Sequence, residues 1–353
     1  MKVVVPTLML STVVFFRLGA TLDAQEFDRL YVDQYMPLRS ELMIADTNGS
    51  NPRKLVPGLE IDYNASFSYD GQWVVFTSDR SGSADIYRVR VSGRDLERLT
   101  QHPAFDDQAE LSPDNRLLAF VSSRGDGSTD IYIKDVERGD VRNLTNASGG
   151  DFRPSWSPDG TMIAFSSDRG TGFPHQDFPD PAGKWEHVQA ASVYVINADG
   201  TGLRKLTTNP DMMAGSPKWS ADGTKLVFYE LLVRDTFRAH FGGSSSSIVS
   251  VDVTTGERNV HIAGGGLNVS PQFLAPGRVA YLIKTRGSGT LAFTSGDESS
   301  PGDLANPSWS RDGTRVVYHA GQMETMHHYS NTLGRPLSGT VAEPGFELVF
   351  ASG

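Results

Sequence analysis

Side chains able to bind a metal ion or a partner are concentrated in three long connections of an otherwise regular chain. These connections span Arg169–Ala191, Glu230–Ser246 and the segment that begins at His319. Long loops on one face of a rigid scaffold commonly carry binding residues. The candidates for this loop face are His175, Asp177, Trp185, His187, Arg234, His240 and His319.

Two kinds of chemistry compete for these residues. Imidazole and carboxylate groups can hold zinc or another transition ion, which would permit a metal-dependent lyase or hydrolase. However, the spacing of His175 and His187 matches no established metal-ligand pattern. We therefore predict no metal ligands here, favour binding of a protein or a glycan through these loops, and keep the metal-dependent enzyme as the last alternative.

Other signatures of catalysis are missing from the sequence. There is no cysteine, which excludes disulfides, thiolate zinc sites and cysteine nucleophiles. The sequence also lacks a Gly-x-Ser-x-Gly elbow, a P-loop and a dinucleotide fingerprint. We therefore predict no catalytic residues and favour a protein without enzymatic activity.

The loops are spaced by a repeating unit. The turn "SPDG" at Ser157–Gly160 returns, with small changes, at Ser68–Gly71, Ser112–Asn115, Ser220–Gly223 and Ser310–Gly313. Serine and aspartate bond the local backbone in such turns, and glycine or asparagine supplies a positive φ. A short apolar run follows each turn, and the first three turns are about 45 residues apart, the length of a repeat with four strands.

Four strands in such a unit are typical of a propeller blade. Six units have a second strand after the turn, but the last unit, Pro307–Ala320, has only a first and a second strand. The segment Glu41–Val56 supplies a third and a fourth strand with nothing before them. The sequence therefore predicts an all-β, six-bladed propeller of four-stranded blades, its ring closed by N-terminal strands that join the last blade.

The stretch "SPDGTMIAFSSDRG", followed by "SVYVINADGTGLRKLT", resembles the repeat of TolB-type propellers, which belong to the WD40-like (PD40) class of bacterial envelope proteins. The resemblance covers residues 39–320. It implies a periplasmic or secreted propeller that binds another protein. TolB itself has a further α/β domain before its propeller, which this sequence does not show, so the resemblance does not carry over a Tol–Pal role.

The resemblance also implies that a cation such as calcium can lie in the central channel. Oxygen donors for it would come from Asp79, Asp85, Asp126 and Asp130. We favour another interpretation, in which these residues form turns and ion pairs with neighbouring arginines, and we predict no cofactor. The arginines are Arg80, Arg124 and Arg169.

The two ends of the chain differ from the repeat. Residues 1–24 resemble a secretory signal peptide, with one lysine, an apolar stretch too short to span a membrane and small residues near its end, and residues 25–38 form a linker. Residues 321–353 form a tail with one unpartnered strand at Phe346–Phe350. That strand could fold onto its own ring, continue into a longer propeller array, or join a neighbouring molecule.

The net charge of −10 argues against a nucleic-acid partner, because an acidic surface repels phosphate. Together these observations favour an exported, non-catalytic scaffold that binds a protein or a glycan through its long-loop face. The first alternative is a structural subunit that self-associates through residues 346–350.

Overall fold

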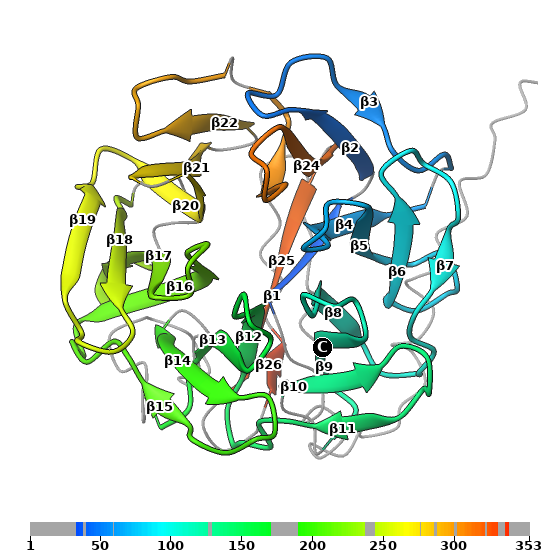
Figure 1. Ribbon diagram of the computed structural model, residues 1–353, viewed down its shortest axis with the longest axis horizontal. Helices are drawn as coiled ribbons and strands as arrows, with labels where there is room; N and C mark the ends of the chain where they lie inside the picture. Colours follow the sequence, from blue (N-terminus) through cyan, green and yellow to red (C-terminus); the bar gives the residue numbers. More distant parts are fainter. Residues whose placement is uncertain are drawn as a thin grey trace, which may run out of the picture.

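Six antiparallel sheets surround a central channel in the computed structural model (Figure 1). The structure describes residues 33–37, 40–58, 60–125, 129–170, 190–236, 244–275, 277–285, 288–299, 302–321, 323–330 and 336–338. The predicted all-β, six-bladed propeller is confirmed. Within these residues no helix is long and apolar enough to cross a membrane.

Each blade runs from the channel to the rim. The innermost strands are β4 (Asp62–Phe67), β8 (Asp106–Leu111), β12 (Asp151–Trp156), β16 (Met212–Trp219), β20 (Leu267–Ala275) and β23 (Ala305–Trp309). The second strands are β5 (Trp73–Ser78), β9 (Leu117–Ser122), β13 (Met162–Ser167), β17 (Lys225–Leu232), β21 (Arg278–Thr285) and β24 (Arg315–Ala320). Their apolar residues are buried on both faces, as expected for strands between neighbouring blades.

The third strands are β6 (Asp85–Arg90), β10 (Asp130–Asp135), β14 (Ser192–Asn197), β18 (Ser247–Asp252), β22 (Ser288–Phe293) and β2 (Glu41–Asp46). Short outer strands complete five blades: β7 (Glu97–Arg98), β11 (Val141–Asn143), β15 (Arg204–Lys205), β19 (Arg258–Ile262) and β3 (Arg53–Lys54). The blade of β20–β22 has three strands, and two isolated bridges, Gly289 to Gly302 and Ala292 to Glu298, extend its outer side.

The repeated turns connect each innermost strand to the second strand. In the turn at Ser157–Gly160, the Ser157 hydroxyl donates to Asp159 Oδ1 at 2.6 Å, and the same oxygen accepts the Thr161 amide at 3.0 Å. Gly160 has a φ of +71°, which glycine adopts without strain. These bonds lower the pKa of the Asp159 carboxyl. All the turns of this type lie on one face of the ring, which we name the turn face.

A bulge interrupts every innermost strand. The pairing with the second strand skips two residues, and the first of the two has a positive φ although it is not glycine. Bulges sharpen the twist of a strand and redirect its side chains. The six positive-φ residues line a space of about 60 Å³ in the channel and are Asn64, Gln108, Arg153, Ser216, Ser270 and Asn306.

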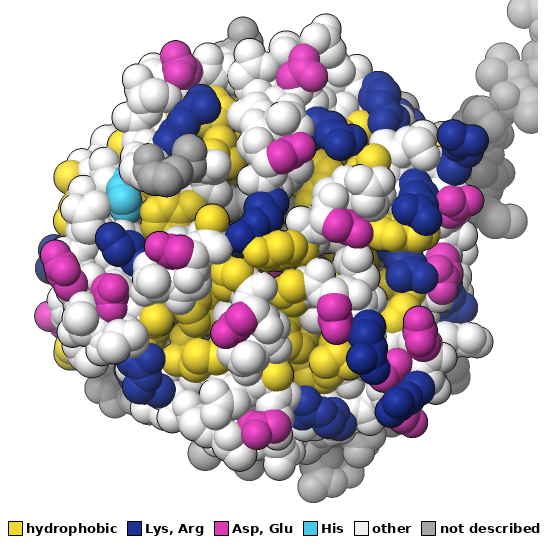
Figure 2. All heavy atoms as spheres, viewed as in Figure 1, with side chains coloured by type: hydrophobic (Ala, Val, Ile, Leu, Met, Phe, Trp, Pro, Cys, Tyr) yellow, Lys and Arg dark blue, Asp and Glu magenta, His cyan; other side chains and the backbone are white. Residues whose placement is uncertain are grey.

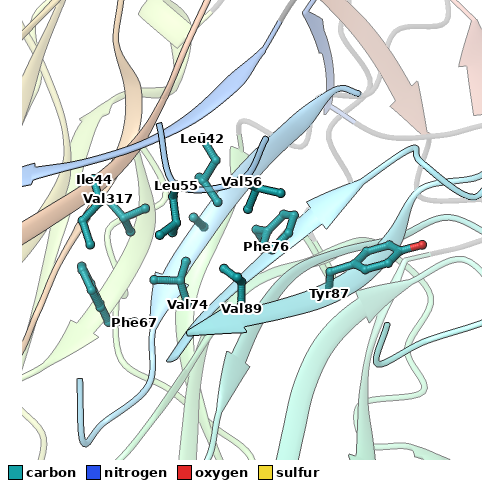
Figure 3. Close-up of a cluster of buried hydrophobic side chains, with 11 residues drawn as sticks. Leu42, Ile44, Leu55, Val56, Phe67, Val74, Phe76, Tyr87, Val89 and Val317 are labelled. Atoms are coloured by element: carbon teal, nitrogen blue, oxygen red, sulfur yellow. The ribbon is translucent and has the colours of Figure 1, made fainter. Parts of the chain in front are cut away.

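Strands from the two ends of the propeller close the ring as predicted. β2 pairs with β24 from Glu41 opposite Ala320 to Asp46 opposite Arg315. Figure 3 shows how this closed blade packs on its neighbour: side chains of the β2 segment and β24 meet those of β4, β5 and β6 in one buried cluster. Leu42 is 0% exposed and Ile44 is 2% exposed. Closure therefore buries apolar area that would otherwise face water.

Each of three consecutive blades contains an equivalent buried ion pair, and its aspartate differs from those predicted. Arg80 pairs with Asp62 at 2.7 Å, Arg124 with Asp106 at 2.6 Å, and Arg169 with Asp151 at 2.5 Å. Each arginine follows the second strand, and each aspartate begins the innermost strand of the same blade. The guanidinium also lies over two aromatic rings, as Arg124 does over Phe120 and Tyr132 at 5.0 and 5.3 Å.

The aspartates considered above as cation ligands, or as partners of Arg80, Arg124 and Arg169, bind other groups. Asp85 accepts from Arg98 at 2.6 Å and from Ser81 at 2.7 Å, and Asp79 accepts the Ile61 amide at 2.9 Å. Asp130 accepts from the Asn143 side chain at 2.8 Å. Burial raises the pKa of the Asp130 carboxyl. Asp126 lies outside the described residues.

Strands from the N- and C-terminal segments of the chain form a small separate sheet. β1 (Asp33–Pro37) pairs antiparallel with β25 (Met323–Ser330), which pairs with β26 (Pro336–Ser338). Figure 1 draws β1 and β25 across the middle of the ring. The predicted linker therefore contains a strand that pairs within the same chain. The predicted signal peptide and the tail strand at 346–350 lie outside the described residues.

Candidate functional site

The structure describes two of the seven predicted loop-face residues and does not bring them together. Arg234 is exposed in a short 3-10 helix, Val233–Asp235, that follows β17. His319 lies in β24, two blades away, and its side chain is only 1% exposed. Burial lowers the pKa of His319 to about 3, helped by the charges of Arg153 and Lys284. His319 is therefore a core residue of the strand rather than a loop ligand.

The other five predicted residues lie outside the described part of the chain. They are His175, Asp177, Trp185, His187 and His240. The loop-face site therefore stays a prediction.

A deep hollow opens instead on the turn face, at the mouth of the channel. Its volume is about 600 Å³. Figure 2 looks onto this face and shows hydrophobic side chains gathered around its centre, with charged side chains around them. We name this hollow the funnel. Its apolar lining consists of Phe67, Tyr69, Leu111, Pro113, Trp156, Pro158, Trp219, Ala221, Phe273, Leu274 and Trp309.

The tryptophans of the funnel are fixed in place by their indole N–H groups. Trp156 Nε1 donates to the Glu110 carbonyl at 3.1 Å, and Trp219 Nε1 donates to the Ser155 carbonyl at 3.0 Å. Each bond joins the innermost strand of one blade to that of the preceding blade. Buried aromatic rings that are held by such bonds present a fixed apolar wall.

Charged and amide groups lie deeper, between the apolar wall and the channel. Glu110 accepts the Trp156 amide at 3.0 Å and forms an ion pair with Lys218. At the equivalent position of another blade, Gln272 accepts the Trp309 amide at 3.0 Å and donates to the Trp309 carbonyl at 2.7 Å. The base of the funnel is thus polar and internally bonded.

The upper wall of the funnel carries basic groups. His261 contacts Ser250 Oγ at 2.9 Å and lies edge-on to Phe273. Burial, followed by the charge of Lys225, lowers the pKa of His261. Arg311 reaches over Tyr69 at the mouth, with 3.7 Å between the guanidinium carbon and the ring centroid. A neutral His261 leaves the lysine and the arginine as the cations of this wall.

The channel residues do not fit a divalent cation. Asp107 accepts two hydrogen bonds from the Asn64 amide at 2.9 Å and one from Thr77 Oγ1 at 2.6 Å. Glu110 is paired with Lys218. Calcium prefers several carboxylate and carbonyl oxygens without a competing cation. Among the described residues there is also no group of three or more His, Asp or Glu side chains placed to hold a metal.

Sequence reasoning missed the funnel because it assigned binding to the longest loops. A signal was present. A large apolar residue precedes most of the repeated turns, although such a residue by itself indicates only packing. The turns converge on the channel axis, so these residues form a common wall.

Comparisons with known proteins agree with this fold. Residues 30–126 match the PD40 family, described as the TolB beta propeller domain. The Tol-Pal system protein TolB of Francisella tularensis subsp. tularensis is 28% identical over 86 residues, covering 24% of this chain and 20% of the relative. The matched segment thus spans about a fifth of that curated relative's length.

Two solved structures share the architecture. A TolB candidate from Agrobacterium tumefaciens superposes with a TM-score of 0.61 at 18% identity, covering 80% of this chain and 98% of that one. TolB from Acinetobacter baumannii gives a TM-score of 0.56 at 20% identity, covering 81% of this chain and 65% of that one. At these identities the likeness concerns the fold. The repeat, the family match over residues 30–126 and the six-bladed ring together support a propeller of the TolB-type PD40 kind.

Proposed function

We propose that this TolB-type propeller is a non-catalytic scaffold that takes a segment of a partner protein into the funnel. The observation that carries the proposal is the funnel itself: a hollow of about 600 Å³ with a fixed aromatic wall and a polar base. Sites of this size and lining are typical of specific binding pockets. A volume of this order admits a few side chains, so we expect a loop or an extended segment as the occupant.

The rigidity of the scaffold supports the same role. Trp309 is 1% exposed, Trp156 is 5% exposed, and both are held by hydrogen bonds. A wall that is already ordered loses little conformational entropy when a partner docks. The relative from Francisella tularensis is, by its name, a component of the Tol-Pal system. That name supports a protein partner for this chain without identifying it.

Export belongs to the same proposal. Residues 1–24 have the charge and apolar pattern of a signal peptide, and the resemblance to TolB-type propellers favours the bacterial envelope. We therefore expect the partner to be a protein of the periplasm or of the cell surface.

Filling the funnel tests the proposal. Ala221 is exposed at the rim, so Ala221→Trp would occupy the mouth without entering the core. Thr254→Trp is the matched control, because Thr254 is exposed in the turn between β18 and β19 and does not line the funnel. Arg234→Glu probes the long-loop face. The measurement is capture of a defined partner from envelope extract of the producing organism, quantified by mass spectrometry and repeated with purified partner.

We expect Ala221→Trp to abolish capture, while Thr254→Trp and Arg234→Glu retain it. Loss only in Arg234→Glu would move binding to the long-loop face and refute the funnel. A ligand that survives protease but not periodate would be a glycan, which would refute a protein partner. Circular dichroism of each variant checks that the ring is folded.

A further inference from the structure

We infer that Arg311 makes the funnel selective for partner segments that carry a carboxylate next to their apolar anchor. The inference rests on the proposed function, because it names the chemistry of the segment that enters the funnel. The carboxylate could be an Asp or Glu side chain or the end of a chain, since both present the same acceptor to a guanidinium.

Arg311 lies across the mouth of the funnel. It leaves the turn Ser310–Gly313, and its Nη2 donates to the Ala221 carbonyl at 2.9 Å. That carbonyl belongs to a turn two blades away. The guanidinium also lies over the Tyr69 ring, which belongs to the adjacent blade on the other side. One side chain therefore connects three turns, and Figure 2 shows a basic side chain beside the hydrophobic centre of this face.

This arginine is exceptional in the repeat. The equivalent turn residues are Tyr69, Pro113, Pro158 and Ala221, none of which is charged. The second position of the turn is thus uncharged in those four turns and cationic at Arg311, which lies at the mouth through which a partner segment enters the funnel.

The bond that holds Arg311 is one that a carboxylate could replace. Its acceptor is the neutral carbonyl of an exposed residue, and a hydrogen bond from a guanidinium to a carboxylate is roughly twice as strong as one to a neutral acceptor. Ala221 would regain water when released, so little is lost at that end. The Tyr69 ring keeps the guanidinium plane in place while its acceptor changes.

The nearby carboxylates are already engaged by their own turns. Asp312 accepts from Ser310 at 2.6 Å and from Thr314, and Asp70 accepts from Ser68 at 2.6 Å and from Asn115. Within the described residues, no ion pair joins Arg311 to either of them.

The funnel's charge balance also favours an anionic occupant. The described side chains that line it include Arg311, Lys225 and Lys218, against Glu110 and Asp222. Lys218 is neutralised by Glu110, and Asp222 is bonded within its own turn. Asp222 keeps its negative charge, so the three cations of the lining exceed its two carboxylates by one, an excess that favours a carboxylate on a protein whose net charge is −10.

A heptapeptide library displayed on phage provides the probe. It is selected in parallel on the wild type and on Arg311→Gln, with Ala221→Trp used to discard peptides that bind outside the funnel. Arg116→Gln is the matched control, because Arg116 is exposed on the turn face but does not line the funnel. One selected peptide is then synthesised with Asp or Asn at its acidic position, and with a free or an amidated C-terminus, for calorimetry.

We expect acidic residues to be enriched on the wild type and on Arg116→Gln, and not on Arg311→Gln. Replacing Asp by Asn in the peptide should weaken binding to the wild type about tenfold, as one hydrogen bond to a charged group would, and leave binding to Arg311→Gln unchanged. A gain from the free C-terminus alone would identify the chain end as the carboxylate.

Two outcomes would overturn the inference, and they differ in what they leave standing. Funnel-dependent peptides without acidic enrichment would refute selection by Arg311 but retain the funnel as a binding site. Peptides that bind Ala221→Trp as well as the wild type would refute both the inference and the proposed function.

Discussion

Replacing Arg124 with methionine would leave a buried carboxylate in blade β8–β11 without its cation. The Asp106 side chain is 0% exposed and accepts from Arg124 Nη2 at 2.6 and 2.8 Å and from Ser122 at 2.6 Å. Methionine keeps the contact with the aromatic rings beneath the guanidinium. The variant therefore removes the charge pair with little loss of packing.

The expected loss of unfolding free energy is about 3 kcal/mol at pH 7, the lower end of the range for breaking a buried pair, because the arginine is 14% exposed. The loss should shrink in acid. Burial raises the pKa of the Asp106 carboxyl above its ordinary value of 3.8, and removing Arg124 removes a cause that lowers that pKa. The Asp106 carboxyl of the folded variant then binds a proton more readily than that of the unfolded chain. The variant's loss of unfolding free energy relative to the wild type therefore grows as the pH rises through the raised pKa.

Urea unfolding followed by circular dichroism at pH 5 and pH 7 measures both effects. Arg138→Met is the control, since Arg138 is 72% exposed and lies 3.9 Å from Asp135, and such pairs contribute less than about 1 kcal/mol. Adding Asp106→Asn to Arg124→Met should recover part of the stability at pH 7. The reasoning is wrong if Arg124→Met matches Arg138→Met, or if its deficit is the same at both pH values.

Three further variants test closure and the turns. Ile44→Ala should lower the unfolding free energy by about 3 kcal/mol in a urea titration, because Ile44 is 2% exposed in the closing strand; a loss below 1 kcal/mol would contradict its role in closure. Gly93→Ala should destabilise by more than about 1 kcal/mol, since φ is +85° and the new Cβ would lie 2.8 Å from the Leu55 carbonyl oxygen; an unchanged melting temperature would refute this. Asp222→Asn should flatten the acid unfolding curve between about pH 4 and 2, because the Ser220 hydroxyl lowers the pKa of Asp222 to about 2. The stability that ionised Asp222 supplies is present above its pKa in the unfolded chain and is lost as the pH falls through its pKa in the folded protein. An unchanged acid curve would count against it.

The ring could be predicted because one local rule repeats. Ser157, Asp159 and Gly160 each have a reason to occupy their place in the turn, and the same reasons apply in the other blades. The closure could be predicted because a third and a fourth strand stand at one end and a first and a second at the other. Counting the strands at the two ends is sufficient for this prediction, without information on side-chain packing.

The bulges of the innermost strands could not be predicted in the same way. Asn64, Gln108 and Arg153 hold the same backbone conformation but share no side-chain type. Proline follows the position in four of the six blades, as Pro154 follows Arg153, but a proline alone does not indicate a bulge. His319 was misplaced for a related reason. A histidine after an apolar run indicates the start of a loop, yet β24 continues to Ala320 because β2 pairs with it there.

The funnel needed three-dimensional knowledge of a different kind. Each turn can be recognised alone, but the sequence does not show that the second residues of the turns converge on one axis. Only when Tyr69, Ala221 and Arg311 are placed around one mouth does the lone charge become meaningful.

The closing blade makes the order of synthesis matter. Glu41 is among the first ring residues to leave the ribosome, and its partner Ala320 is among the last. At roughly 5–20 residues per second, the first strand waits on the order of tens of seconds for the blade that completes it. During that interval the nascent chain has an unpaired edge at each end, and a strand from another molecule can dock there. The pairing of β2 with β24, which forms last, thus decides whether the ring closes on its own strands or pairs with a strand of another molecule.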